Sequence, residues 1–157
     1  MKFSAQEEYG LRCLLQIGRL GEGGSMTIPE ISRVEGMTQT HVAKLLMILR
    51  KAGFITSTRG HLGGYTLARA AEQIAVGEVL EALGGKLYDD QFCGKHTGQN
   101  EICRHAVDCS VRSLWQVVQT AVDGVLDKVS LDDLVGPAKS PINVTFMERP
   151  RVPERIS

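Results

Sequence analysis

The chain has 157 residues, which is enough for one core-bearing domain with an extra helix or arm but too few for two large domains. Charged residues make up 23% of the chain and hydrophobic residues 43%, which excludes general disorder and is typical of a folded soluble protein. The formal net charge is zero, but the charges are unevenly distributed along the chain.

No apolar run approaches the roughly 18 residues that a membrane span requires. Residues 1–8 also lack the apolar core of a signal peptide. We therefore expect a cytoplasmic protein with no membrane partner. Its four cysteines would then lie in a reducing compartment, where thiols serve metals or redox chemistry more often than structural disulfides.

The first predicted helix runs from about residue 4 to 20. Ser4 and Glu7 form a capping-box pair, and apolar residues then recur at helical spacing. Cys13 falls within the apolar stripe, so we predict that it is a small core residue. Tyr9 is interpreted as a core or interface aromatic, as is Trp115 later in the chain.

Two further helices follow. Thr27 and Glu30 form a second capping box that opens a short helix ending near residue 34. After a glycine-containing turn, Thr38 is the expected N-cap of a longer helix over about 39–52. This order of elements predicts a helix-turn-helix.

A β-hairpin and a fourth helix are predicted next. Residues 54–58 and 65–67 are β-prone and flank the glycine-rich turn 59–64, a pattern typical of a wing. Residues 74–83 predict the helix. The expected fold class is mainly α with a small β-hairpin, a winged helix-turn-helix plus a long dimerisation helix.

The C-terminal half contains an irregular segment and one long helix. Residues 88–109 show no periodicity and predict a loop that a ligand would hold in place. Residues 110–129 predict a helix with a continuous apolar stripe, which indicates packing against a partner helix or, equally, ordinary core packing. A short helical turn begins near residue 130, and the tail from residue 136 is rich in proline. The stripe consists of Val111, Leu114, Val118, Val122 and Val125.

A stretch without acidic residues lies between Glu35 and Glu72. The basic residues within it are Lys44, Arg50, Lys51, Arg59 and Arg69, with His41 and His61 beside them. Such a stretch is either a solvated basic face or an electrostatic footprint for a nucleic acid.

The location of this stretch favours DNA. In helix-turn-helix proteins the N-terminal residues of the second helix reach base edges in the major groove, and an arginine on a wing can reach phosphate or a narrow minor groove. The glycines of the wing would allow close backbone approach and positive φ. The alternative is that Thr38 only caps its helix and the other residues are solvated. The candidate DNA-contacting residues are Thr38, Gln39, Thr40, His41, Lys44, Arg50, Arg59, Gly60, His61, Gly63, Gly64 and Tyr65.

Three cysteines, Cys93, Cys103 and Cys109, cluster in the irregular segment, separated by nine and then five residues. Soft thiolate ligands favour iron-sulfur clusters or zinc. Unligated or redox thiols are the alternative. Candidates for a fourth ligand are His96, Glu101, His105, Asp108 or a residue from elsewhere, notably Glu8.

Nothing in the sequence supports an enzyme. The GxxxxGK phosphate-binding pattern is absent. No nucleophile, base and orienting acid fall together. We therefore predict no catalytic activity and no small-molecule substrate.

Several motifs together resemble one known family. They are the segments 8–12 (EYGLR), 45–53 (LLMILRKAG), 59–69 (RGHLGGYTLAR) and 76–82 (VGEVLEA), followed by the three cysteines. Over about residues 1–135 the chain resembles the Rrf2 family of winged-helix transcription regulators, with its IscR, NsrR and RsrR types. The resemblance implies a homodimer in which the helix 110–129 packs against its partner and presents two winged helices to a pseudo-palindromic site on double-stranded DNA.

The resemblance also implies a cluster held by Cys93, Cys103 and Cys109. In IscR-type members a histidine three residues after the last cysteine completes the site, and that position is Arg112 here. In NsrR- and RsrR-type members the fourth ligand is an acidic residue from the first helix of the other subunit, and Glu8 occupies the matching position. The expected cofactor is a 2Fe-2S cluster, with a 4Fe-4S cluster as the other possibility.

The sequence hypothesis is thus a sequence-specific DNA-binding regulator controlled by an iron-sulfur cluster that senses redox state, iron or nitric oxide. The alternatives are the same fold with a zinc site or thiol/disulfide switch, and a small redox protein that does not bind DNA. We expect a DNA-binding domain over 1–85, a cluster loop over 86–109, dimerisation and short terminal helices over 110–135, and a flexible tail over 136–157.

Overall fold

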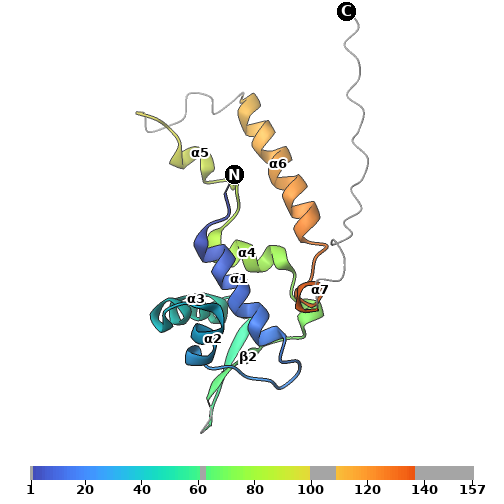
Figure 1. Ribbon diagram of the computed structural model, residues 1–157. Coiled ribbons are helices and arrows are strands. Elements are labelled where there is room, and N and C mark those ends of the chain that lie inside the picture. The colour runs from blue at the N-terminus through green and yellow to red at the C-terminus, as the bar shows by residue number, and fades with distance from the viewer. Residues whose placement is uncertain (1, 61–62, 100–108, 137–157) are drawn as a thin grey trace, which may run out of the picture.

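The computed structural model describes residues 2–60, 63–99 and 109–136. Within these ranges the fold is mainly helical with one antiparallel hairpin, as the sequence predicts (Figure 1). The helices are α1 (Ala5–Gly18), α2 (Ile28–Glu35), α3 (Gln39–Lys51), the 3-10 helix η1 (Ala71–Gln73), α4 (Val76–Gly84), α5 (Phe92–Lys95), α6 (Ser110–Leu126) and α7 (Leu131–Val135). The hairpin strands are β1 (Ile55–Thr58) and β2 (Gly64–Leu67).

Local capping interactions begin the first two helices, as predicted. The Glu7 N–H donates to Ser4 Oγ at 3.2 Å, and the Ser4 N–H donates back to the Glu7 carboxylate at 2.6 Å. Thr27 and Glu30 form the same reciprocal pair ahead of α2. Gly36 then ends α2 with a left-handed backbone at φ 68°, which glycine adopts without strain.

The hydrophobic core lies where α1 packs against α3, α4 and α7. Its fully buried members come from every major element of the N-terminal region and from α7. Cys13 is 0% exposed, which confirms it as a core residue. The largest buried side chains are Leu14, Ile17, Ile31, Leu45, Leu46, Leu49, Ile55, Ile74 and Leu131.

A buried carboxylate joins α1 to the end of α2. The Glu35 side chain is only 5% exposed, and its two oxygens accept from Arg12 Nη2 at 2.6 Å and from Gln16 Nε2 at 2.5 Å. The hydrogen bond with Glu35 raises the pKa of Arg12. Since a buried charge is stable only when it is paired, these contacts hold the turn before α3 against α1.

The hairpin is attached to the body through Met26. Tyr65 and Met26 exchange two backbone hydrogen bonds of 2.9 and 3.0 Å. A Cβ added at Gly64 would lie 3.0 Å from the Met26 carbonyl oxygen, so the close approach of the two backbones favours glycine there. Thr58 Oγ1 also bonds to both the N–H and the C=O of Gly64, each at 3.0 Å.

Helix α6 extends away from the core (Figure 1). Among its residues only Gln119 is buried. The chain then returns to the body, where Leu131 is fully buried and its N–H donates to the Ile74 carbonyl at 2.8 Å. The predicted helix 110–129 therefore ends earlier, because Val129 instead accepts a hydrogen bond from the Val76 N–H at 2.8 Å.

Three expectations need correction. The irregular segment 88–109 contains the short helix α5. The helix predicted from residue 74 begins at Val76, after the 3-10 turn η1. Of the wing glycines expected to take positive φ, Gly60 does so at 149°, whereas Gly63 and Gly64 do not.

The predicted tail lies outside the described residues from position 137 onward. In the described part of the chain, none of the helices combines the length and apolar character needed to cross a membrane.

Substituting Gly10 with alanine tests the α1–α4 contact. The added Cβ would lie 2.4 and 2.6 Å from the methyl carbons of Leu83, which is 2% exposed and confined by the core. We expect a loss of about 1–3 kcal/mol in the free energy of unfolding, measured by urea denaturation. Gly94→Ala is the matched control because its Cβ would meet no atom within 4 Å. Equal denaturation midpoints for Gly10→Ala and the unaltered protein would contradict this packing.

Candidate functional site

The orientation of α3 follows from its apolar face. Val42, Leu45, Leu46 and Leu49 are all 0% exposed, so the opposite side of the helix faces outward. The exposed positions at and along α3 are Thr38, Gln39, Thr40, Lys44, Met47, Arg50 and Lys51. The predicted contact residues of this helix, His41 excepted, therefore lie on the surface.

The N-terminus of α3 is capped and has no acidic residue in its first turn. Thr38 Oγ1 accepts from the His41 N–H at 3.3 Å. The other N–H groups of the first turn and the positive end of the helix dipole favour an anion at this end. The capping role of Thr38 and an outward-facing first turn thus occur together.

His41 differs from its predicted neighbours on α3. It is only partly exposed, and its ring meets the ring of Tyr9 edge-on with 5.6 Å between centroids. The guanidinium carbon of Arg12 lies over the same Tyr9 ring, 5.4 Å from its centroid. His41 therefore packs against α1, a contact between distant segments that the sequence pattern did not reveal.

Met47 is a surface residue that the sequence reasoning missed. It is 50% exposed and lies three residues after Lys44, so both are on the outer face of α3. Its signal was present in the sequence, because Met47 falls out of step with the buried positions Val42, Leu45 and Leu49. An exposed thioether can contact apolar groups such as a thymine methyl.

The predicted DNA-contacting residues of the hairpin lie partly at its tip and partly at its base. Arg59, Gly60 and Gly63 are exposed at the tip, which projects from the body beside the helices (Figure 1). Gly64 is buried against Met26, and Tyr65 packs against the core. The last two residues therefore hold the wing in position. His61 lies outside the described residues.

Arg69 has a different environment from the other basic residues of the acid-free stretch. It forms an ion pair with Glu78 at 2.9 Å and lies over the Phe54 ring, so an acid from outside the stretch offsets its charge. Within the described ranges, no ion pair involves the remaining four cations. These are Lys44, Arg50, Lys51 and Arg59.

Two of the predicted sulfur ligands converge on Arg112. Cys93 lies in α5, and Cys109 is the N-cap of α6. The Arg112 N–H donates to Cys109 Sγ at 3.3 Å. The neighbouring Cys93 raises the pKa of Arg112. Cys103 lies outside the described residues.

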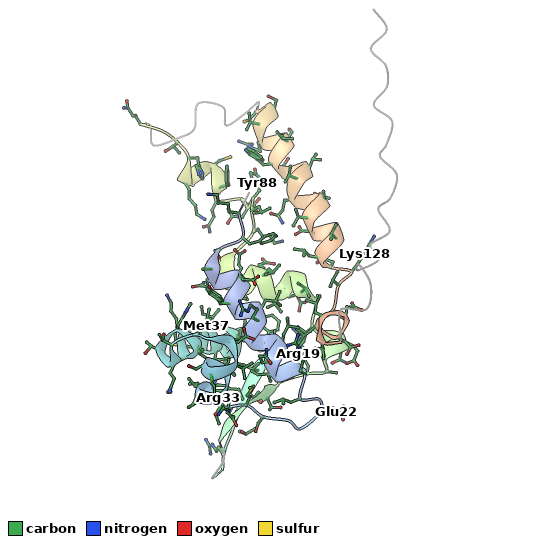
Figure 2. The ribbon with its side chains drawn as sticks, in the orientation of Figure 1. Arg19, Glu22, Arg33, Met37, Tyr88 and Lys128 are labelled. Carbon is green, nitrogen blue, oxygen red and sulfur yellow. The ribbon has the colours of Figure 1, made fainter. Side chains whose placement is uncertain are left out.

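Tyr88 connects this site to the middle of α6. Its backbone N–H donates to Oε1 of the buried Gln119 at 2.9 Å, and its ring lies 5.3 Å from that of Phe92. Figure 2 shows Tyr88 between α5 and α6. Desolvation by burial raises the pKa of Tyr88, and the neighbouring Cys93 adds to the effect.

The other proposed ligands are dispersed. Glu8 is exposed on α1, and His96 stacks on Phe92 with 4.2 Å between ring centroids. In the ranges that the structure describes, no three His, Cys, Asp or Glu side chains come together as a metal site. Cys13 is buried in the core, apart from Cys93 and Cys109. Burial raises its pKa to about 12, which keeps it a thiol. Glu101, His105 and Asp108 lie outside the described residues.

Known proteins resemble the chain over most of its length. The model of the Rrf2 family, described as "Iron-dependent Transcriptional regulator", matches residues 3–137. Protein rrf2 of Nitratidesulfovibrio vulgaris Hildenborough is 36% identical over 135 residues, covering 86% of this chain and 87% of the relative. IscR of Cronobacter sakazakii is 30% identical over 135 residues, covering 86% and 80% of the two chains.

Solved structures agree in fold. T. potens IscR has a TM-score of 0.67 at 27% identity, with 86% of each chain covered. The oxidised form of Staphylococcus aureus CymR has a TM-score of 0.68 at 26% identity, covering 89% of this chain and all of that one. With a hairpin wing beside a helix-turn-helix and a family match that spans nearly the whole described region, the chain belongs to the Rrf2 family of transcription regulators.

Proposed function

We propose that the outer face of α3 and the tip of the wing bind double-stranded DNA, and that an iron-sulfur cluster held by Cys93, Cys103 and Cys109 controls this binding. The observation that carries the proposal is the set of exposed cations on α3 and the wing, which have no acidic partner among the described residues. The regulator would work in the cytoplasm.

In this proposal α3 enters the major groove. Gln39 and Thr40 in its first turn reach base edges, and Lys44 and Met47 follow along the same face. Arg59 at the wing tip contacts phosphate or the minor groove. The buried contacts of Glu35 with α1, and of Gly64 with Met26, keep the two surfaces in a fixed relation.

Lys44→Ala combined with Arg59→Ala tests the DNA surface. The probe is a duplex selected by the unaltered protein from a randomised pool, and the readout is fluorescence anisotropy across a salt series. Losing two cations from the DNA surface should weaken binding and flatten the slope of log affinity against log salt by about 2. Lys128→Ala is the matched control, because this exposed lysine follows the C-terminal end of α6, on the side of the molecule away from α3 (Figure 2). An unchanged affinity and slope in the double variant would reject this surface.

We also propose that α6 packs against α6 of a second copy. Val111, Leu114 and Val117 on this helix are 54%, 53% and 67% exposed, and Trp115 is 38% exposed. A contiguous apolar face on a 17-residue helix, about 25 Å long, is costly to leave in water. A two-fold pairing of winged helices would match two half-sites on DNA.

Leu114→Glu tests the pairing. A carboxylate at the centre of the apolar face should convert a dimer into a monomer, measured by sedimentation velocity. Gln116→Glu adds the same charge to an exposed position of the same helix and should leave the dimer intact. A monomeric unaltered protein, or a dimeric Leu114→Glu variant, would argue against α6 as the interface.

The described residues fit a thiolate-bound anionic group. Cys93 and Cys109 converge on the cation Arg112, and Gln119 fixes the chain at Tyr88. When bound, an iron-sulfur cluster would supply a redox-active centre held by the cysteine thiolates. Within one described chain Glu8 does not join Cys93 and Cys109 in a metal-binding group, which supports Glu8 of the second copy as the fourth ligand.

Anaerobic reconstitution with iron and sulfide tests the cluster. The visible absorption of a thiolate-bound cluster should appear in the unaltered protein and be lost in Cys93→Ser and Cys109→Ser. Cys13→Ala should retain it, since that thiol is buried in the core. Iron content and Mössbauer spectra would separate a 2Fe-2S from a 4Fe-4S cluster. A colourless unaltered protein would remove the cluster from the proposal.

A thiol switch or a zinc site is the second candidate for control. Cys93 and Cys109 are both free and only partly exposed, and free thiols outside the core can also bind zinc or be oxidised to a disulfide. Zinc analysis of the isolated protein and mass spectrometry after treatment with a disulfide-forming oxidant would distinguish the two forms.

A further inference from the structure

Met47 is an apolar side chain at the centre of the outer face of α3. The buried positions Val42, Leu45 and Leu49 define the inner face. At about 100° of rotation per residue, Met47 lies almost opposite to them. In the described part of the chain it is the exposed large apolar residue that lies on α3, and half of its surface is open to solvent. Burial in the core therefore does not account for an apolar side chain at this position.

Ala43 and Met47 together form a small apolar strip on this face. Residues four positions apart are neighbours on a helix, and a long helical side chain leans toward the turn that precedes it. Met47 is therefore directed over Ala43, which is partly exposed and has only a methyl group as its side chain. The exposed Lys44 and Lys51 flank the strip along the helix, and within the described ranges neither forms an ion pair.

An apolar strip between two cations fits a ligand that carries negative charge and an apolar group side by side. The major groove of DNA offers this combination, because phosphates line the groove and the C5-methyl group of thymine projects into it. The other base edges in the groove present hydrogen-bond donors and acceptors. A thioether is flexible and polarizable, so the Met47 side chain can adapt its shape to a methyl group.

We propose that Ala43 and Met47 recognise the C5-methyl group of a thymine in the major groove, so that this strip sets part of the sequence preference of α3. The inference rests on the proposed DNA binding. Met47 lies seven residues after Thr40, which is about 10 Å along the helix axis. Since base pairs are about 3.4 Å apart, the recognised thymine lies within about three base pairs of the bases that the first turn of α3 contacts.

Replacing thymine with deoxyuridine tests this contact, because the two bases differ only in the C5-methyl group. The probe is the duplex selected by the unaltered protein, with each thymine replaced in turn, and the readout is fluorescence anisotropy at one salt concentration. At one position per half-site the replacement should weaken binding about 4-fold, the effect of removing one buried methyl group. Met47→Ala should bind both duplexes equally, whereas Met47→Leu should still prefer thymine because it keeps an apolar side chain of similar size.

Leu20→Ala is the matched control, because Leu20 is 46% exposed, close to the value for Met47, but follows α1 rather than lying on α3. This variant should keep the thymine preference of the unaltered protein. A preference that persists in Met47→Ala, or that is absent from the unaltered protein, would overturn methyl recognition and leave the proposed DNA binding standing. If the unaltered protein enriched no duplex from the randomised pool, the proposed function would fail, and this inference would fail with it.

Discussion

Packing of the apolar face of α3 against α1 is the contact on which the rest of the structure depends. Val42, Leu45 and Leu49 are fully buried, and each contributes about 1.5–3 kcal/mol relative to exposure. This contact fixes the rotation of α3 about its axis, so Thr40 and Lys44 must face outward. A rotation by one residue, about 100°, would bury polar groups and expose apolar ones.

The parts of the fold that could be predicted from the sequence depend on local interactions. The Ser4–Glu7 and Thr27–Glu30 caps are formed by residues three positions apart, so their patterns are visible in the sequence. The missed features depend on contacts between distant segments. Examples are the ion pair of Glu78 with Arg69 and the packing of Tyr9 on His41. Helix α5 was missed for another reason, because a four-residue helix is too short to show a periodic pattern.

In the candidate site, too, local features could be predicted from the sequence and contacts between distant segments could not. Exposure along α3 follows directly from helical periodicity, and so it could be predicted. The cysteine spacing indicated a ligand site, but the convergence of Cys93 and Cys109 on Arg112 needs α5 and α6 to be brought together. The sequence reasoning considered Arg112 only as the residue in place of a ligand, whereas its backbone N–H donates to Cys109 Sγ and its pKa is raised by the neighbouring Cys93.

The proposed DNA surface and the segment with α5 lie at different ends of the molecule (Figure 1), so the proposed control must act through the elements between them. The segment 88–93 is tied to α6, and α6 reaches the winged helix through α4 and α7. In the proposed dimer, a change at the cysteines would alter how the two copies pair and, through that, the spacing of the two α3 helices on DNA. The most direct measurement is the affinity of one selected duplex for the cluster-loaded and cluster-free protein at the same salt concentration. The account predicts affinities that differ by about 5- to 150-fold, and equal affinities would contradict it.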